Sequence, residues 1–235
     1  MPEGTAIAAA GEAPARRRIL RAELGATVKL ALPMALTQLG QTAMLTTDVL
    51  LVGRLVYEKG FQLALDALPG VIEQVGEVRF LVAGSGTHEH ELRAQAERLG
   101  LLEHGTFLGW IGDDVLHSLY RIADLCVVPS IYEPFGLVAL EAMASGCPCI
   151  VADTGGLREV VPVGERVGLR FNGGDAQHLG VMIERLLVDD ALRDRLVTEA
   201  SEHVLSFDWY DVAQRTRGIY DELARLAPRE GAGRG

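Results

Sequence analysis

The stretch LCVVPSIYEPFGLVALEAMASGCPCIVADTGGLREVV, residues 125–161, has the pattern strand, loop, helix, strand, loop, helix. Its two strand segments are short, apolar and bounded by Pro or Asp, as in strands that are buried on both faces. The apolar segment between them lies between Pro134 and Gly146, residue types that suit the start and the end of a helix. The pattern therefore predicts parallel strands that are connected by helices.

The same alternation continues on both sides of this stretch. Further strands are predicted at residues 49–55, 78–84, 105–109 and 167–171, with helices at 61–75, 88–100 and 114–122 and two or three amphipathic helices in 175–226. We expect an α/β fold with a single Rossmann-like, doubly wound parallel sheet. Ligands of such sheets bind at the carboxyl ends of the strands, so the strand-to-helix loops contain the candidate site residues.

Composition limits the number of domains and the kind of partner. The chain has 235 residues, 49% of them hydrophobic, which is enough for one α/β domain but not for two. The net charge of −10 argues against a nucleic-acid partner, because phosphate binding needs basic surfaces. The three cysteines lie in apolar segments without CxxC or His/Cys spacing, so we expect no metal site, no disulfide scaffold and a cytoplasmic location.

The first part of the chain differs in composition from the rest. Eighteen uncharged residues separate Lys29 from Asp48, which is a marginal length for a membrane span. Six of the eighteen are Thr or Gln, which disfavours a lone membrane span. Membrane association through this segment stays an alternative to the cytoplasmic location. The expected organisation is disorder at residues 1–18, one hydrophobic helix at 19–47, the α/β domain at 48–226 and a frayed tail at 227–235.

Two early loops contain candidate ligand contacts. Arg54 and Lys59 share the loop after the first strand, just before a helix, where two cations could bind a diphosphate or could be ordinary surface charges. Gly84 opens the turn Gly84-Ser85-Gly86, which is either a tight turn beneath a nucleotide or a plain turn. Glu89 stands where the dinucleotide fingerprint needs its third glycine, which disfavours NAD.

The loop before residue 135 is the most informative of all. The first-turn amides of Gly136 and Leu137 have no intrahelical acceptor and point toward the strand ends. Glu133 precedes this helix and could simply be a helix N-terminal charge. Glu141 lies in an apolar second turn and needs partners, either ligand hydroxyls or an arginine from a neighbouring helix.

A further strand-to-helix loop follows residue 152. Gly155 and Gly156 stand side by side at a predicted helix start. They could offer backbone amides to a ligand at close range, or they could form a plain glycine-rich turn.

Three segments, in this order and spacing, resemble a known family. VGRLVYEKG at 52–60, SIYEPFGLVALEAMASGCP at 130–148 and ADTGGLREVV at 152–161 are similar to the C-terminal domain of retaining glycosyltransferases of the sucrose-synthase and family-four type, closest to starch and glycogen synthases. The resemblance covers residues 49–226. It implies the nucleotide-sugar-binding half of a GT-B fold, in a hexosyltransferase that takes a donor such as UDP- or ADP-glucose and a glycan or other hydroxyl acceptor.

The resemblance also implies roles for single residues. Glu133, which would face the donor sugar, would act with Arg54 and Lys59, which would neutralise the diphosphate. Glu141 would bind the ribose hydroxyls. The remaining expected substrate contacts are Gly84, Trp110, Phe135, Gly136, Leu137, Gly155 and Gly156, with residues 108–110 near the base. No metal is expected and no cofactor, since the nucleotide sugar is itself a substrate.

The chain departs from this family at its N-terminal end. Two-domain enzymes of this type place the active site between two Rossmann-like domains, and the residues before the first strand leave no room for a second one. We therefore expect the chain to be inactive alone, and a non-catalytic nucleotide-sugar-binding module or an inactive fusion fragment stays an alternative. Residues 19–55 resemble the first transmembrane helix of multidrug and toxin extrusion transporters, which predicts a junction near residues 52–55.

Overall fold

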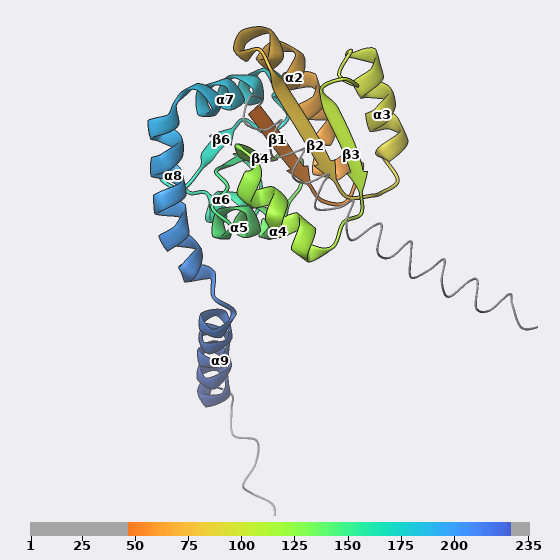
Figure 1. Cartoon of the computed structure of the whole chain (residues 1–235). Coiled ribbons are helices and arrows are strands. Elements are labelled where there is room, and N and C mark those ends of the chain that lie inside the picture. The colour runs from red at the N-terminus through yellow and green to blue at the C-terminus, as the bar shows by residue number, and fades with distance from the viewer. Residues whose placement is uncertain (1–46, 227–235) are drawn as a thin grey trace, which may run out of the picture. The chain divides into compact units, whose positions relative to one another are not determined.

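The computed structural model describes residues 47–226, coloured in Figure 1. The hydrophobic helix predicted at residues 19–47 lies outside the described residues except for its last residue, which belongs to a strand. The disorder predicted at residues 1–18 and the frayed tail predicted at 227–235 also lie outside them. Within residues 47–226, no helix is both long and apolar enough to cross a membrane.

Six parallel strands form one sheet in the order β3-β2-β1-β4-β5-β6. Their bounds are β1 Thr47–Val52, β2 Val78–Ala83, β3 Gly105–Gly109, β4 Leu125–Val128, β5 Cys149–Ala152 and β6 Leu169–Phe171. The order reverses between β1 and β4, which pair directly, with Leu50 opposite Cys126. This is the doubly wound sheet that the sequence predicts, and the reversal is the point where such sheets bind ligands.

Helices cover both faces of the sheet (Figure 1). On one face, α2 Phe61–Val75 packs against α3 Glu89–Arg98 and α7 Ala176–Val188. On the other face lie α4 Asp113–Ile122 and α5 Leu137–Ala144, which contacts the short α6 Leu157–Val160. Two 3-10 turns, η1 Tyr57–Lys59 and η2 Val204–Phe207, complete these connections, and α8 Asp190–His203 contacts both α5 and α7. The two layers of helices explain why the strand segments are apolar throughout.

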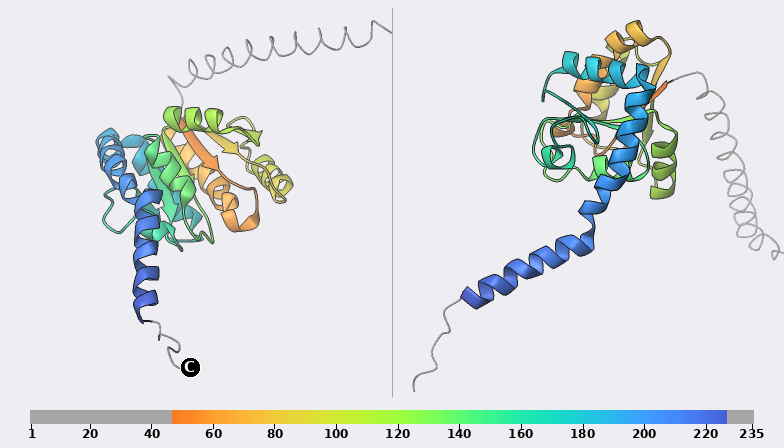
Figure 2. Two further views of the ribbon diagram at one scale, coloured as in Figure 1. Left: turned by 90° about the horizontal axis from the view of Figure 1, so that it is seen from below. Right: turned by 90° about the vertical axis from the view of Figure 1, so that its left-hand side faces the viewer.

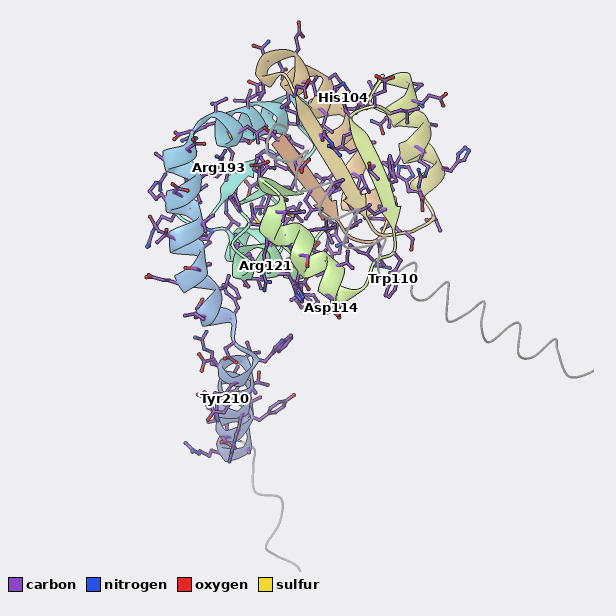
Figure 3. The ribbon with its side chains drawn as sticks, viewed as in Figure 1. His104, Trp110, Asp114, Arg121, Arg193 and Tyr210 are labelled. Atoms are coloured by element: carbon purple, nitrogen blue, oxygen red, sulfur yellow. The ribbon has the colours of Figure 1, made fainter. Side chains whose placement is uncertain are left out.

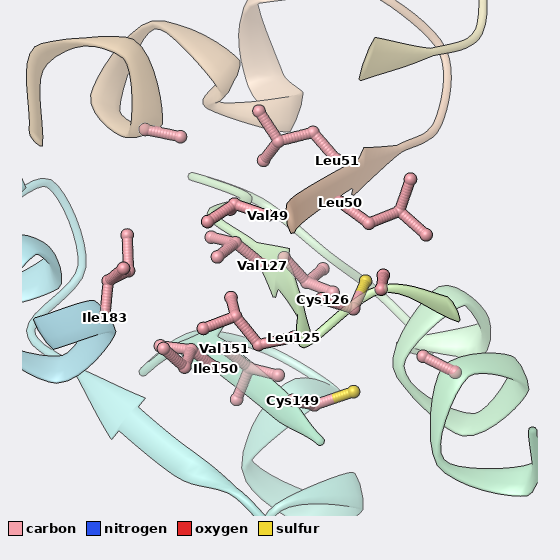
Figure 4. Close-up of a cluster of buried hydrophobic side chains, with 14 of the residues drawn as sticks. Val49, Leu50, Leu51, Leu125, Cys126, Val127, Cys149, Ile150, Val151 and Ile183 are labelled. Atoms are coloured by element: carbon pink, nitrogen blue, oxygen red, sulfur yellow. The ribbon is translucent and has the colours of Figure 1, made fainter. Parts of the chain in front are cut away.

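The central strands are buried on both sides (Figure 4). Val49, Leu50 and Leu51 have no exposed surface, although their side chains alternate between the two faces. Ile183 of α7 covers one face. On the other face, the buried thiol of Cys149 donates weakly to the Ala139 carbonyl of α5 at 3.7 Å. This two-sided core fixes the strands, and hence the loops at their carboxyl ends.

The last described helix, α9 Trp209–Leu226, has no buried residue (Figure 2). Seven of its large apolar side chains are exposed: Trp209, Tyr210, Val212, Ile219, Tyr220, Leu223 and Leu226. With α7 and α8 it gives the three amphipathic helices expected in residues 175–226. α9 therefore takes no part in the core that positions the strand-end loops.

Candidate functional site

The loops that follow β1 and β4 bind each other at the point where the strand order reverses. The amide of Ile131 donates to the carbonyl of Glu58 at 2.9 Å. Gly60 has a φ of 68°, and a Cβ added there would lie 2.0 Å from the carbonyl oxygen of Pro129. Only glycine permits this approach, because any side chain would separate the two loops. The contact brings the cation of one loop to the carboxylate of the other.

That carboxylate, Glu133, is 6% exposed, and both of its oxygens accept hydrogen bonds. Lys59 donates to its Oε2 at 2.6 Å, and the Ser130 hydroxyl donates to the same oxygen at 3.3 Å. The amide of Gly136 donates to Oε1 at 3.3 Å. Burial alone would raise the pKa of Glu133, but the bonds from Lys59, Gly136 and Ser130 outweigh it and hold the pKa below its ordinary value. Glu133 is therefore an oriented carboxylate at neutral pH.

Helix α5 begins at Leu137, slightly later than the start near Phe135 that the sequence predicts. The reason is Gly136, whose φ of 77° is left-handed and places it at the N-cap. Its amide is occupied by Glu133, whereas within the described residues the amides of Leu137 and Val138 have no hydrogen-bond acceptor. These two amides, at the positive end of the helix, could bind an anion.

The glycine pair after β5 packs against the backbone of Glu133. A Cβ added at Gly155 would lie 2.2 Å from the Glu133 carbonyl oxygen, and the amide of Gly156 donates to the same oxygen at 2.8 Å. The Thr154 hydroxyl donates to the Ile131 carbonyl at 3.1 Å. The sequence left open whether these glycines offer amides to a ligand. Because the amide of Gly156 donates to the Glu133 carbonyl, it is not free for a ligand, and the loop after β5 holds the Glu133 loop in place.

The second carboxylate of the motif, Glu141, has a different environment. Its side chain is exposed, and its Oε2 accepts a hydrogen bond at 3.4 Å from the hydroxyl of Tyr120 on α4. Partial burial raises the pKa of Glu141, and Tyr120 and His117 offset only part of that shift. Within the described residues, no arginine or lysine pairs with Glu141, so the arginine partner considered from the sequence is not what holds it.

A separate cavity of about 220 Å³ lies at the carboxyl ends of β1, β2 and β3. Arg54, Gly84 and Trp110 line it. Trp110 is 79% exposed and stands at the end of β3 (Figure 3). Arg54 is exposed and has no ion-pair partner within the described residues. A Cβ added at Gly84 would lie 1.9 Å from the Gly53 carbonyl oxygen, so this glycine joins two loops.

The predicted site residues thus form three groups, and the contacts described above lie within each group rather than between them. The first is a contact cluster, comprising Lys59, Glu133, Gly136, Gly155 and Gly156. The second lines the cavity with Arg54, Gly84 and Trp110. The third is Glu141 with its partner Tyr120. Phe135 and Leu137 are exposed and flank Gly136 of the first group. Ser130 and Tyr120 were missed from the sequence, because nothing in an apolar strand end or helix marks a residue that bonds a distant carboxylate.

The Lys59–Glu133 pair and the open amides of Leu137 and Val138 lie where the strand order of this α/β domain reverses, which is the place where doubly wound sheets bind their ligands. Residues 45–203 match the family model "Glycosyl transferases group 1", and the chain belongs to this family. The resemblance to glycosyltransferases of the glycogen-synthase type is therefore confirmed.

Three similar proteins illustrate the family. Glycogen synthase of Mycobacterium tuberculosis is 38% identical over 174 residues, which cover 74% of this chain and 42% of that protein. Sucrose-phosphate synthase of Thermosynechococcus elongatus is 34% identical with a TM-score of 0.70, covering 81% of this chain and 48% of the other. The HepE protein of Anabaena, solved in complex with UDP-glucose, is 28% identical with a TM-score of 0.68, covering 80% and 51%. The chain spans about half the length of these proteins, or less.

The comparisons do not support the predicted likeness of residues 19–55 to a transporter helix. The family match begins at residue 45 and includes the segment 52–55 that both resemblances shared. That segment ends β1 and starts the loop that carries Arg54. Membrane association is likewise unsupported, and residues 19–46, on which it depended, lie outside the described residues.

Proposed function

We propose that this domain binds a nucleotide sugar such as UDP- or ADP-glucose and is the donor-binding part of a retaining hexosyltransferase. One observation carries the proposal. The Lys59–Glu133 pair lies beside the open amides of Leu137 and Val138, where the loops after β1 and β4 meet. A donor placed there would have its phosphates near cations and helix amides, and its sugar near a carboxylate.

Each part of the donor has a chemically suitable neighbour. An ammonium group has three N–H donors, and Lys59 uses one on Glu133, so the others stay available for phosphate oxygens. Arg54 adds a second, unpaired cation at the cavity lined by Trp110. We assign that cavity to the base, and Glu141 to the ribose hydroxyls. UDP-glucose in the complex of the similar HepE protein supports this class of ligand.

The proposed chemistry uses the same groups. The bond between the anomeric carbon and the phosphate oxygen breaks, and the electron pair stays with the departing nucleoside diphosphate. Lys59, Arg54 and the amide of Leu137 stabilise that developing charge. Glu133, ionised and oriented, stabilises the oxocarbenium-like sugar. The acceptor hydroxyl attacks from the leaving-group side and passes its proton to the departing diphosphate oxygen, so the configuration is retained. The reaction needs no cofactor, because the donor is itself a substrate.

One alternative is a module that binds the nucleotide sugar without turning it over. The chain spans 42% of the glycogen synthase to which it is similar, and no acceptor-side residue is among those placed at the site. The donor site would be the same in both cases, so binding alone does not distinguish an enzyme from a binding module. Release of nucleoside diphosphate does.

The test is calorimetric titration of the purified chain with UDP-glucose and ADP-glucose, followed by an assay for released nucleoside diphosphate. We expect saturable binding of at least one donor and a clear loss of affinity in Arg54→Ala. The matched control is Arg217→Ala, which removes an exposed arginine of α9. Absence of binding to either donor, or equal affinities in the two variants, would refute the proposed site.

A further inference from the structure

Tyr120 is a completely buried tyrosine whose hydroxyl has one hydrogen-bond partner within the described residues. That partner is Oε2 of Glu141, 3.4 Å away. Removing a phenol hydroxyl from water costs free energy unless it is hydrogen-bonded, and a phenylalanine would fill the same space without that cost. The hydroxyl therefore serves Glu141 rather than the packing of the core.

The bond connects two helices that follow different strands. Tyr120 is near the end of α4, which leads into β4, and Glu141 lies in α5, which follows β4. Glu141 is otherwise an exposed side chain on a helix surface, and it would lose rotamer freedom on binding a ligand. A hydrogen bond to Oε2 orients the Glu141 carboxylate before a ligand binds, and within residues 47–226 the other oxygen, Oε1, has no hydrogen-bond partner.

We propose that Tyr120 is a positioning residue, which holds Glu141 so that its second oxygen accepts a hydrogen bond from the ribose of the bound nucleotide. The inference rests on the proposed function, because it needs a nucleotide at the site. Tyr120 does not touch the ligand itself. Its contribution is to reduce the ordering of Glu141 that binding would otherwise require.

The test uses ligands that differ only in the ribose. UDP and ADP are titrated first, and the one that binds is compared with its 2′,3′-dideoxy counterpart in wild type and in Tyr120→Phe. We expect wild type to prefer the ribose form, and Tyr120→Phe to reduce that preference about three- to tenfold, as for the loss of one hydrogen bond. Affinity for the dideoxy form should stay unchanged.

Two further variants serve as controls for Tyr120→Phe. Glu141→Gln should lose most of the preference for the ribose form. Tyr220→Phe, which removes the hydroxyl of an exposed tyrosine on α9, should leave it intact. Carboxyl NMR titration of the free protein adds a second readout, since Tyr120→Phe should raise the pKa of Glu141 by removing a bond to its ionised form.

The outcomes separate the inference from the proposed function. Equal weakening of both nucleotides by Tyr120→Phe, or failure of this nearly isosteric variant to fold, would assign the hydroxyl a purely structural role and overturn the inference. An unchanged preference would overturn it as well. If Glu141→Gln abolishes the preference and Tyr120→Phe does not, only the role of Tyr120 fails. If wild type binds neither nucleotide, the proposed function itself fails.

Discussion

Glu133 shows, at the scale of single residues, what the sequence could predict and what it could not. Its place before a helix made it a candidate carboxylate. Its burial and its bond to Lys59, 74 residues earlier in the chain, were not predictable, because they depend on which loops become neighbours. The sequence left open whether Lys59 binds a diphosphate or is an ordinary surface charge. The structure makes it the partner of a buried carboxylate, so it also contributes to the stability of the domain.

This dual role predicts that removing Lys59 and removing Arg54, the two cations of the loop after β1, change the free energy of unfolding by different amounts. Lys59→Ala leaves the buried Glu133 without its charged partner and should lower the free energy of unfolding at pH 7 by about 1–3 kcal/mol. Arg54→Ala removes an exposed side chain and should change it by less than about 0.5 kcal/mol. Urea unfolding measures both. Indistinguishable midpoints would show that the pair contributes nothing to folding.

The two carboxylates of the motif should respond to pH in opposite directions. The pKa of Glu133 is lowered from its ordinary value of 4.5, so its contribution to stability is present above that pH and is lost as pH falls through the folded-state pKa. Glu133→Gln should therefore lose less stability than wild type between neutral pH and about pH 3.

Glu141 provides the contrasting case. Its pKa is raised from 4.5, so its contribution is present below that value and is lost as pH rises through the folded-state pKa. Glu141→Gln should then be at least as stable as wild type at pH 7 while binding nucleotide more weakly. Unfolding curves at several pH values test both statements. A larger acid sensitivity in Glu133→Gln than in wild type would contradict the assignment.

At the scale of elements, the sequence predicts the strands and helices well and their neighbours poorly. The helix at residues 61–75 is found at those bounds, because its apolar positions recur at helical spacing. The meeting of the loops after β1 and β4 depends on the strand order, which no local pattern records. The sequence left open whether Gly84 and Gly155 lie against a ligand or form plain turns. In the structure, Gly60, Gly84 and Gly155 each let one loop pack against the backbone of another.

Two glycines with nearly equal backbone angles test this packing. Gly60 has a φ of 68° and Gly100 a φ of 71°, but an added Cβ would collide with the Pro129 carbonyl only at Gly60. Both alanine variants bear the left-handed strain of about 1–2 kcal/mol. Gly60→Ala should cost at least about 1 kcal/mol more and weaken nucleotide binding, because the loops must separate. Similar unfolding midpoints for the two variants would contradict the account.

At the scale of the whole molecule, the parallel α/β fold and the glycosyltransferase family were both predictable from the sequence. Periodicity predicted the strand segments, and the motif around Glu133 and Glu141 carried the resemblance. Turnover was not predictable, because it depends on how an acceptor is held. The six strands of the sheet all lie within residues 47–226, so the donor site should not need the residues before them.

Deletion of residues 1–46 tests this independence. The truncated chain keeps every strand and every loop of the proposed site, so we expect its thermal unfolding and its nucleotide affinity to match those of the full chain. Circular dichroism and calorimetry provide the comparison. Cooperative unfolding of the truncated chain, or loss of its affinity, would show that the preceding residues belong to the folded domain.

The most direct test of the central claim is NMR mapping of the donor on the backbone amides. Addition of UDP-glucose or ADP-glucose to isotopically labelled protein should shift the amides of residues 53–60, 130–138 and 155–156, which lie at the carboxyl ends of β1, β4 and β5. The amides of Asp48 and Asp124, at the opposite end of the sheet, should not move. Shifts confined to that opposite end, or none with either donor, would contradict the claim that this domain binds a nucleotide sugar where its strand order reverses.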